Sequence, residues 1–181
     1  MNLDKLTIKA QQALQEAQQL AAENENQLIE NGHIIKGILL ADESVLPHLL
    51  SKLGVNTNVV SQAVEKIIES YPKVSGGQQT LSRYAQDSLN KATKFAKDMN
   101  DEFVSIESLL LGIVASGDQV SQLLKDAGVT EKELKSAIAE LRKGERVTSA
   151  SAEDNYNSLN KYAKNLNKLA QEGKIDPVIG R

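Results

Sequence analysis

Apolar residues recur every three or four positions along most of the chain, a spacing that predicts amphipathic helices. In the first such segment they fall at Ala10, Leu14, Ala17 and Leu20, which would share one helix face. Thr7 stands just before this segment. A Thr or Ser at that place caps a helix, because its hydroxyl accepts a hydrogen bond from a backbone N–H of the first turn. The sequence therefore predicts a helix that starts after Thr7.

The same apolar pattern occurs twice. With an offset of 75 residues, apolar positions fall on apolar positions and Gly37 falls on Gly112; after one residue drops out, the offset becomes 74 and Gly54 falls on Gly128. The matched pairs include Leu6 with Leu81, Ala10 with Ala85, Leu14 with Leu89, Leu20 with Phe95 and Ile29 with Val104. A repeat of this length indicates a duplicated structural unit. We place repeat 1 at about residues 6–71 and repeat 2 at about 81–143.

Each repeat is predicted to contain four helices. In repeat 1 they follow Thr7, span His33 to Leu40 and about Ser44 to Leu53, and follow Asn56; in repeat 2 they follow Ser82, span Glu107 to Val114 and about Gln119 to Ala127, and follow Thr130. The second helix is the most apolar and contains Gly37 or Gly112. Glycine costs a helix about 1 kcal/mol relative to alanine, so close helix packing is the expected reason for it. The predicted fold is all-α, with about eight helices arranged as a pseudo-twofold duplication.

Two polar segments and a final helix complete the predicted organisation. Lys73 to Thr80 joins the repeats, and Gly144 to Ala152 reads as a second, flexible linker of small polar residues. A last helix is expected from about Asp154 to Glu172. We therefore expect a double-repeat domain over 1–145, followed over 146–181 by the linker, this helix and the start of another domain.

Composition and charge exclude several function classes. The net charge of −3 argues against nucleic-acid and anionic-membrane partners, which need clustered Lys and Arg. The absence of cysteine excludes disulfides, thiolate nucleophiles and Cys-ligated zinc. The chain shows neither the apolar run of a signal peptide at its start nor the roughly 20 apolar residues of a membrane helix. We expect a cytoplasmic protein.

Candidate chemistry is sparse, and no enzymatic activity is predicted. Neither a phosphate-binding G-x-x-x-x-G-K-[ST] loop nor a G-x-G-x-x-G motif is present. Glu30 and His33 have the E-x-x-H spacing of half a di-iron site, but Ser105 and Ser108 stand at the matching positions of repeat 2. We therefore predict no metal site and assign His33 to the start of a buried helix.

Residues 49–68 also resemble a helix-turn-helix motif with a turn at Gly54. The would-be recognition helix carries Glu65 and Glu69 against a single Lys66. Because acidic side chains repel phosphates, the preferred interpretation is an ordinary helix hairpin, and a DNA-binding function is only a distant alternative.

Three segments resemble the amino-terminal end of a ClpB-type AAA+ protein disaggregase, a chaperone. They are MNLDKLTIKAQQALQEAQ, QLIENGHII and LNKYAKNLNKLAQEGKIDPVIGR. The duplicated repeat resembles the paired Clp amino-terminal repeats, and DPVIGR resembles the entry to the first ATPase domain of that family. The resemblance implies that Val178 and Ile179 border ATP in a full-length parent, whereas the present chain has no cofactor of its own.

The resemblance also implies a function. The full-length machine is a homohexamer that uses ATP to thread aggregated chains through its pore, together with a DnaK-type chaperone system. Its amino-terminal domain is a mobile module, monomeric by itself, that binds unfolded or aggregated polypeptides weakly and passes them to the pore. A flexible segment such as Gly144 to Ala152 would keep that module near the pore entrance.

The resemblance implies substrate-binding positions as well. Thr7, Asp101 and Glu107 match the family, Phe95 keeps the character of a leucine, and Lys91 and Ser108 depart from two further leucines. Each match has a structural alternative: Thr7 as a helix cap, Glu107 at a helix start and Phe95 as core. The ClpC and ClpA relatives imply an adaptor- or phosphoarginine-binding domain instead. Glu107 matches one acidic member of the phosphoarginine site, but Gly32 replaces the other.

Overall fold

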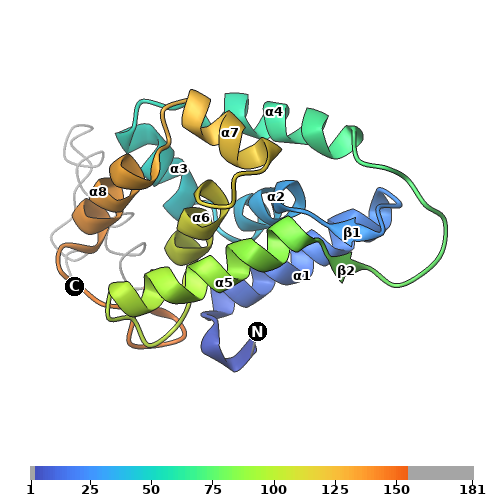
Figure 1. Ribbon diagram of the computed structural model, residues 1–181. Helices are drawn as coiled ribbons and strands as arrows, with labels where there is room; N and C mark the ends of the chain where they lie inside the picture. Colours follow the sequence, from blue (N-terminus) through green and yellow to red (C-terminus); the bar gives the residue numbers. More distant parts are fainter. Residues whose placement is uncertain (1–2, 155–181) are drawn as a thin grey trace, which may run out of the picture.

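A computed structural model describes residues 3–154 of this chain, and these residues form eight α-helices, one short 3-10 helix and one two-stranded sheet (Figure 1). The predicted last helix and the residues Val178 and Ile179 lie outside the described residues. The elements are η1 (Leu3–Lys5), α1 (Ile8–Glu23), β1 (Leu28–Ile29), α2 (Asn31–Ala41), α3 (Val45–Lys52), α4 (Thr57–Glu69), β2 (Thr80–Leu81), α5 (Arg83–Asp98), α6 (Ile106–Val114), α7 (Gln119–Asp126) and α8 (Glu131–Arg142).

The helix starts follow the capping residues that the sequence indicates. The hydroxyls of Thr7 and Ser82 accept hydrogen bonds from the N–H groups of Ala10 and Ala85, at 3.1 and 3.0 Å. Asn56 and Thr130 cap α4 and α8 in the same way. Because these side chains satisfy backbone donors that a helix leaves open, they fix where each helix begins. The four predicted helices of each repeat are confirmed to within about two residues at their starts.

Gly37 and Gly112 allow the central helices to approach their neighbours very closely. A Cβ atom on Gly37 would lie 2.2 Å from the carbonyl oxygen of Ala13, and one on Gly112 would lie 2.1 Å from that of Ser88. No side chain fits at such a distance, so α2 packs on α1, and α6 on α5, backbone against backbone. The predicted packing role of these two glycines is confirmed. All nine residues of α6 are buried, which makes it the centre of repeat 2.

The repeats are related by a pseudo-twofold arrangement in which each contributes an edge to the other. Leu81 pairs with Ile29 in the parallel sheet β1–β2, and Leu6 pairs with Val104 in a parallel bridge. The two pairings are equivalent to each other, because Leu6 corresponds to Leu81 and Ile29 to Val104 in the repeat alignment. Helices of opposite repeats also pack on each other, α3 against α8 and α4 against α7. In Figure 1, α1 and α5 lie along one side and α4 and α7 along the other, with α2 and α6 between them.

The segment after α8 is not a free tether up to Asp154, which corrects our expectation of a flexible linker over Gly144 to Ala152. The N–H of Glu102 donates to the carbonyl of Val147, and the N–H of Ile8 donates to that of Ala150, both at 2.8 Å. The side chain of Val147 is fully buried. Backbone hydrogen bonds provide much of this docking, and they leave no trace in the hydropathy of the segment. We call residues 145–154 the strap.

None of the helices in the described range 3–154 has the length and hydrophobicity that a membrane crossing would require.

Candidate functional site

A groove of about 390 Å³ opens on repeat 2 between α5, α8 and the beginning of the strap. Its apolar lining comes from Phe95, Met99, Ile138 and Ala139. Its polar lining comes from Asp98, Lys135, Arg142, Glu145 and Arg146. An apolar concavity with charges of both signs at its rim is the usual form of a site that binds flexible polypeptides.

Phe95 is the largest apolar side chain of the groove. It packs on the core while remaining only partly buried. The ammonium nitrogen of Lys135 lies 5.0 Å from the centre of the Phe95 ring, a cation–π arrangement. Lys135 also pairs with Glu131 one helical turn earlier, at 3.1 Å. The ring is therefore held in place while part of its surface remains open to a ligand.

Arg142 lines the groove and is anchored from behind. Its guanidinium donates to both carboxylate oxygens of Asp101 at 3.1 and 2.9 Å, to Glu107 at 3.1 Å and to the hydroxyl of Ser105 at 3.1 Å. The side chain of Arg142 is 5 % exposed, and those of Asp101 and Glu107 are fully buried. Buried charges are tolerated only when they are paired and hydrogen-bonded. This cluster therefore fixes one side of the groove.

The predicted acidic site residues thus lie behind the groove. The carboxylates of Asp101 and Glu107 have no exposed surface, so in this structure they face Arg142 and do not line the groove. Glu107 follows the cap residue Ser105 in the first turn of α6, and it also pairs with Arg142. The two acidic residues position Arg142 and contribute to the groove only through it.

Three other predicted residues lie away from the groove. Thr7 and Ser108 are fully buried, so neither presents its side chain at the surface of this structure. Ser108 lies with its hydroxyl 3.3 Å from that of Ser105. Lys91 extends toward the end of α6, where it donates to the carbonyl of Ala115 at 2.8 Å and pairs with Asp87 at 3.0 Å. Of the six predicted substrate-binding residues, Phe95 alone lines this groove.

Repeat 1 has a neutral counterpart of the Arg142 cluster. Asn26 stands at the position equivalent to Asp101, Gly32 at that of Glu107 and Ile68 at that of Arg142. His33 is buried here, with Nδ1 accepting from the N–H of Glu30 and Nε2 facing the side-chain oxygen Oδ1 of Asn26, both at 2.9 Å. Because burial disfavours its charged form, the pKa of His33 falls to about 4. The histidine is therefore a neutral structural residue with both ring nitrogens engaged. Among residues 3–154, no group of His, Asp and Glu side chains is arranged to hold a metal ion.

A second apolar cavity lies at the junction of the repeats. Its volume is about 190 Å³. Leu3, Leu6, Leu14, Gln18, Ile29, Leu81 and Leu89 line it. This cavity has about half the volume of the groove on repeat 2, and no charged side chain lines it. It therefore offers a bound polypeptide fewer contacts than the groove does.

The two alternative functions gain no support from this geometry. Arg142 already occupies the acidic site around Glu107, where a phosphoarginine guanidinium would have to bind. On α4, the helix-turn-helix candidate, the exposed Glu65 pairs with Lys36 at 2.7 Å. The acidic residues Glu65 and Glu69 outnumber Lys66 on this helix, a charge balance unsuited to binding phosphates.

Sequence reasoning predicted none of the groove residues other than Phe95, and four that it missed are Met99, Lys135, Ile138 and Arg142. Three of them continue the ordinary amphipathic pattern of α5 and α8 and carry no distinguishing signal. The sequence did distinguish Arg142, because this residue is aligned with Ile68 in the other repeat. A charged residue at a position that is apolar in the other copy indicates a buried charge with dedicated partners.

Comparisons with known proteins agree on one family. The family model for the Clp repeat (R) N-terminal domain matches residues 5–127. The chain is 54% identical over 181 residues to the chaperone protein ClpB of Bacteroides thetaiotaomicron and 47% identical to that of Porphyromonas gingivalis. It is covered completely by both matches but spans only 21% of the length of each relative.

Two solved structures share the fold. The Hsp104 N-terminal domain from Candida albicans has a TM-score of 0.73 at 21% identity, with 82% of this chain and 98% of that one covered. A ClpV N-domain in complex with a VipB peptide has a TM-score of 0.64 at 18% identity, with 76% and 86% covered.

Proposed function

This chain belongs to the family of Clp repeat N-terminal domains, and from that membership we propose that it is the substrate-binding domain of a ClpB-type disaggregase. In this role it captures unfolded or aggregated polypeptides weakly and passes them to the pore of the parent machine. The peptide bound to the ClpV N-domain supports the proposal, because it is a polypeptide ligand on the same fold.

The groove around Phe95 is the observation that carries the proposal. Unfolded chains expose apolar side chains that folded proteins bury, and a half-buried aromatic ring offers them an apolar surface. The rim of the groove carries charges of both signs, positive at Lys135 and Arg146 and negative at Asp98 and Glu145. Such a rim accepts many sequences, because flanking residues of either charge find a partner.

The activity of the whole parent protein belongs to the same proposal. ATP hydrolysis, assembly into a homohexamer and cooperation with a DnaK-type chaperone would reside in or act through regions that this chain does not contain. On this view the present chain is non-enzymatic, monomeric by itself and located in the cytoplasm. Val178 and Ile179 would border ATP only in the full-length parent.

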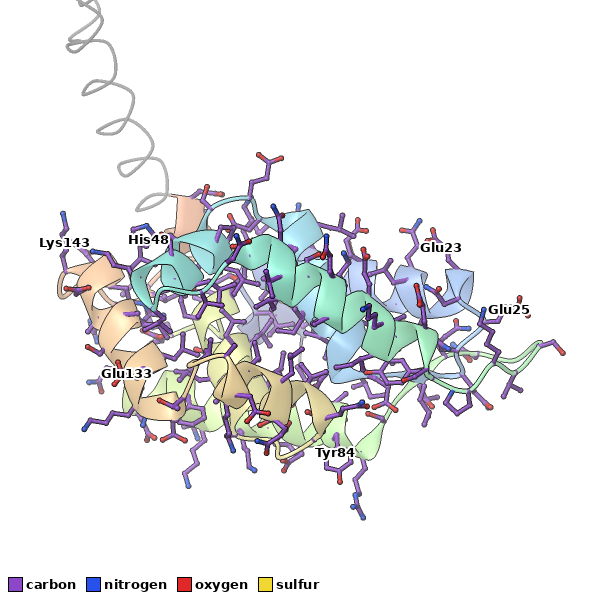
Figure 2. All side chains as sticks on the ribbon, turned by 90° about the horizontal axis from the view of Figure 1, so that it is seen from above. Glu23, Glu25, His48, Tyr84, Glu133 and Lys143 are labelled. Atoms are coloured by element: carbon purple, nitrogen blue, oxygen red, sulfur yellow. The ribbon has the colours of Figure 1, made fainter. Side chains whose placement is uncertain are left out.

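Fluorescence anisotropy tests the proposal with a labelled, permanently unfolded polypeptide such as reduced and carboxymethylated lactalbumin. We expect saturable binding that weakens about tenfold in Phe95→Ala, the scale of losing one aromatic anchor. Tyr84→Ala is the matched control, since Tyr84 lies on the same helix but projects into solvent at 42% exposure (Figure 2). Absence of binding at hundreds of micromolar, with the helical fold intact, would overturn the proposal.

A further inference from the structure

Glu153 is a buried carboxylic acid at the end of the strap. Its side chain has no exposed surface. Its Oε2 accepts a hydrogen bond from the hydroxyl of Thr7 at 2.6 Å and another from the N–H of Ile106 at 3.1 Å. Its Oε1 is buried and has no hydrogen-bond partner. A side chain from residue 153 therefore joins the starts of α1 and α6, which belong to different repeats.

Helices α1, α6 and α8 each contribute a charged residue to the surroundings of Glu153. Glu107 on α6 faces it as a second carboxylate and raises its pKa. Arg142 on α8 is bound to Glu107 and Asp101. Lys9 on α1 lies 3.7 Å from both Asp42 and Asp154. Glu153 is thus held by two neutral donors, while the charged group that shifts its pKa, Glu107, carries the same sign.

This environment favours the protonated acid. Burial is the largest cause that raises the pKa of Glu153, the negative charge of Glu107 acts in the same direction, and the resulting pKa is about 7 in place of 4.5. The hydrogen bonds from Thr7 and Ile106 act the other way, because both donors favour a carboxylate. Burial and like charge prevail. Ionising Glu153 therefore costs free energy while the strap is docked, but not once the strap is released into water.

We propose that Glu153 is a proton-operated latch that holds the strap on the domain when protonated and releases it when ionised. Release would free residues 145–154 from the domain surface. Ten residues of extended chain span up to about 35 Å. The latch would therefore set how far this domain can move from whatever follows it in the chain.

The direction of the pH dependence follows from the two pKa values. In a released strap, Glu153 is in water and titrates at its ordinary 4.5, whereas in the docked strap it titrates near 7. The docked state therefore binds the proton more tightly. Its extra stability is fully present below pH 4.5 and is lost as the pH rises through about 7. The docking equilibrium should change on the order of a hundredfold over this window.

Amide hydrogen exchange measured by NMR tests the latch on the whole chain. The N–H groups of Ile8 and Glu102 report on the strap, since they donate to Ala150 and Val147, while the N–H of Leu109 in α6 reports on the core. After correction for intrinsic exchange, we expect protection of Ile8 and Glu102 to fall on the order of a hundredfold between pH 5 and 8. Protection of Leu109 should change far less, because the opposite pH dependences of His33 and Glu153 largely cancel in the stability of the core.

Glu153→Gln supplies the matched variant, because an amide resembles the protonated acid but does not titrate. Its strap amides should stay protected at every pH. A carbon-13 titration of the Glu153 carboxyl in the unmodified chain supplies an independent check and should give a midpoint near 7. Equal pH profiles for the two proteins, or a carboxyl midpoint near 4.5, would overturn the proposal.

Discussion

Arg142 and Asp101 form a buried ion pair with a shortest distance of 2.9 Å, and this pair joins the end of α8 to the loop before α6. At the equivalent positions, repeat 1 has Ile68 and Asn26, neither of them charged. The same position in the fold is thus occupied by a buried ion pair in repeat 2 and by neutral side chains in repeat 1. Only the charged solution places a guanidinium beside an open groove, which explains why the candidate site lies on repeat 2.

Replacing Arg142 with the Ile of repeat 1 should destabilise the domain by about 3–5 kcal/mol, because Asp101 and Glu107 would remain buried without their cation. Urea unfolding followed by circular dichroism measures this. Lys52→Ala is the control. Its pair with Glu140 is about half exposed and 3.7 Å long, so its loss should cost less than about 1 kcal/mol. Equal effects of the two substitutions would contradict the assigned role of Arg142.

Transferring the whole neutral arrangement should cost less than the single change. The triple variant Arg142→Ile, Asp101→Asn, Glu107→Gly removes the cation together with both buried carboxylates. We expect it to recover at least half of the stability lost in Arg142→Ile, since the penalty comes from unpaired charge. A triple variant less stable than the single one would show that packing dominates.

Gly37→Ala and Gly112→Ala should each destabilise the domain by several kcal/mol. The added methyl group would stand about 2 Å from a backbone carbonyl oxygen, which no side-chain rotation can relieve. Ser136→Ala, at an exposed position of α8, should change stability by less than about 0.5 kcal/mol. Melting temperatures of the three variants decide the matter, and an unchanged value for Gly37→Ala would refute the close approach of α1 and α2.

Thr7→Ala should cost more than Ser82→Ala, although the two residues cap equivalent helices. Each loses a capping hydrogen bond worth about 1 kcal/mol. Thr7 also loses the hydrogen bond to Glu153 that holds the strap. Thr7→Ser keeps the hydroxyl and should restore most of the difference. Equal losses in the two alanine variants would show that the strap contributes nothing to the stability of the domain.

His33 and Glu153 should give stability opposite dependences on pH. The pKa of His33 is lowered to about 4, so its contribution is present above pH 6.5 and is lost as the pH falls toward 4. Glu153 works the other way, with a contribution lost as the pH rises through about 7. Each shift corresponds to about 3 kcal/mol at most.

Two variants separate these contributions. Glu153→Gln keeps the lowered pKa of His33 but removes the Glu153 carboxyl, so acidification from pH 7 to 4.5 should destabilise the domain. His33→Gln keeps the raised pKa of Glu153 but removes the imidazole, so the loss on acidification should be smaller or reversed. Urea unfolding at three pH values measures both slopes. Parallel slopes would contradict the burial of one of the two groups.

Most of the fold could be predicted from the sequence because its determinants are local or periodic. Capping residues such as Thr7 and Thr130 fix the helix starts, and the repeat offset identifies equivalent elements. Gly37 was informative because a helix accepts glycine only for a reason. The exchange of edges between repeats could not be predicted, since the pairings of Leu6 and Leu81 with the opposite copy depend on backbone geometry alone.

The site was harder to predict than the fold. The resemblance pointed to Phe95, which lines the groove, and also to Asp101 and Glu107, which lie behind it in a buried ion-pair cluster. Both are polar residues before or in the first turn of a helix, and nothing in a single sequence distinguishes a buried ion pair from a binding contact. The strap was missed for a related reason: Val147 is a lone apolar residue in a polar segment, and hydropathy gives it no weight.

A chemical-shift map of the chain during titration with a permanently unfolded polypeptide tests the central claim most directly. We predict that the largest shifts fall on Phe95, Met99, Lys135 and Ala139, around the groove on repeat 2. Shifts confined to Leu6, Leu14 and Leu89, at the junction of the repeats, would contradict the assignment of the groove. No shifts at any residue would contradict the proposed polypeptide-binding function itself.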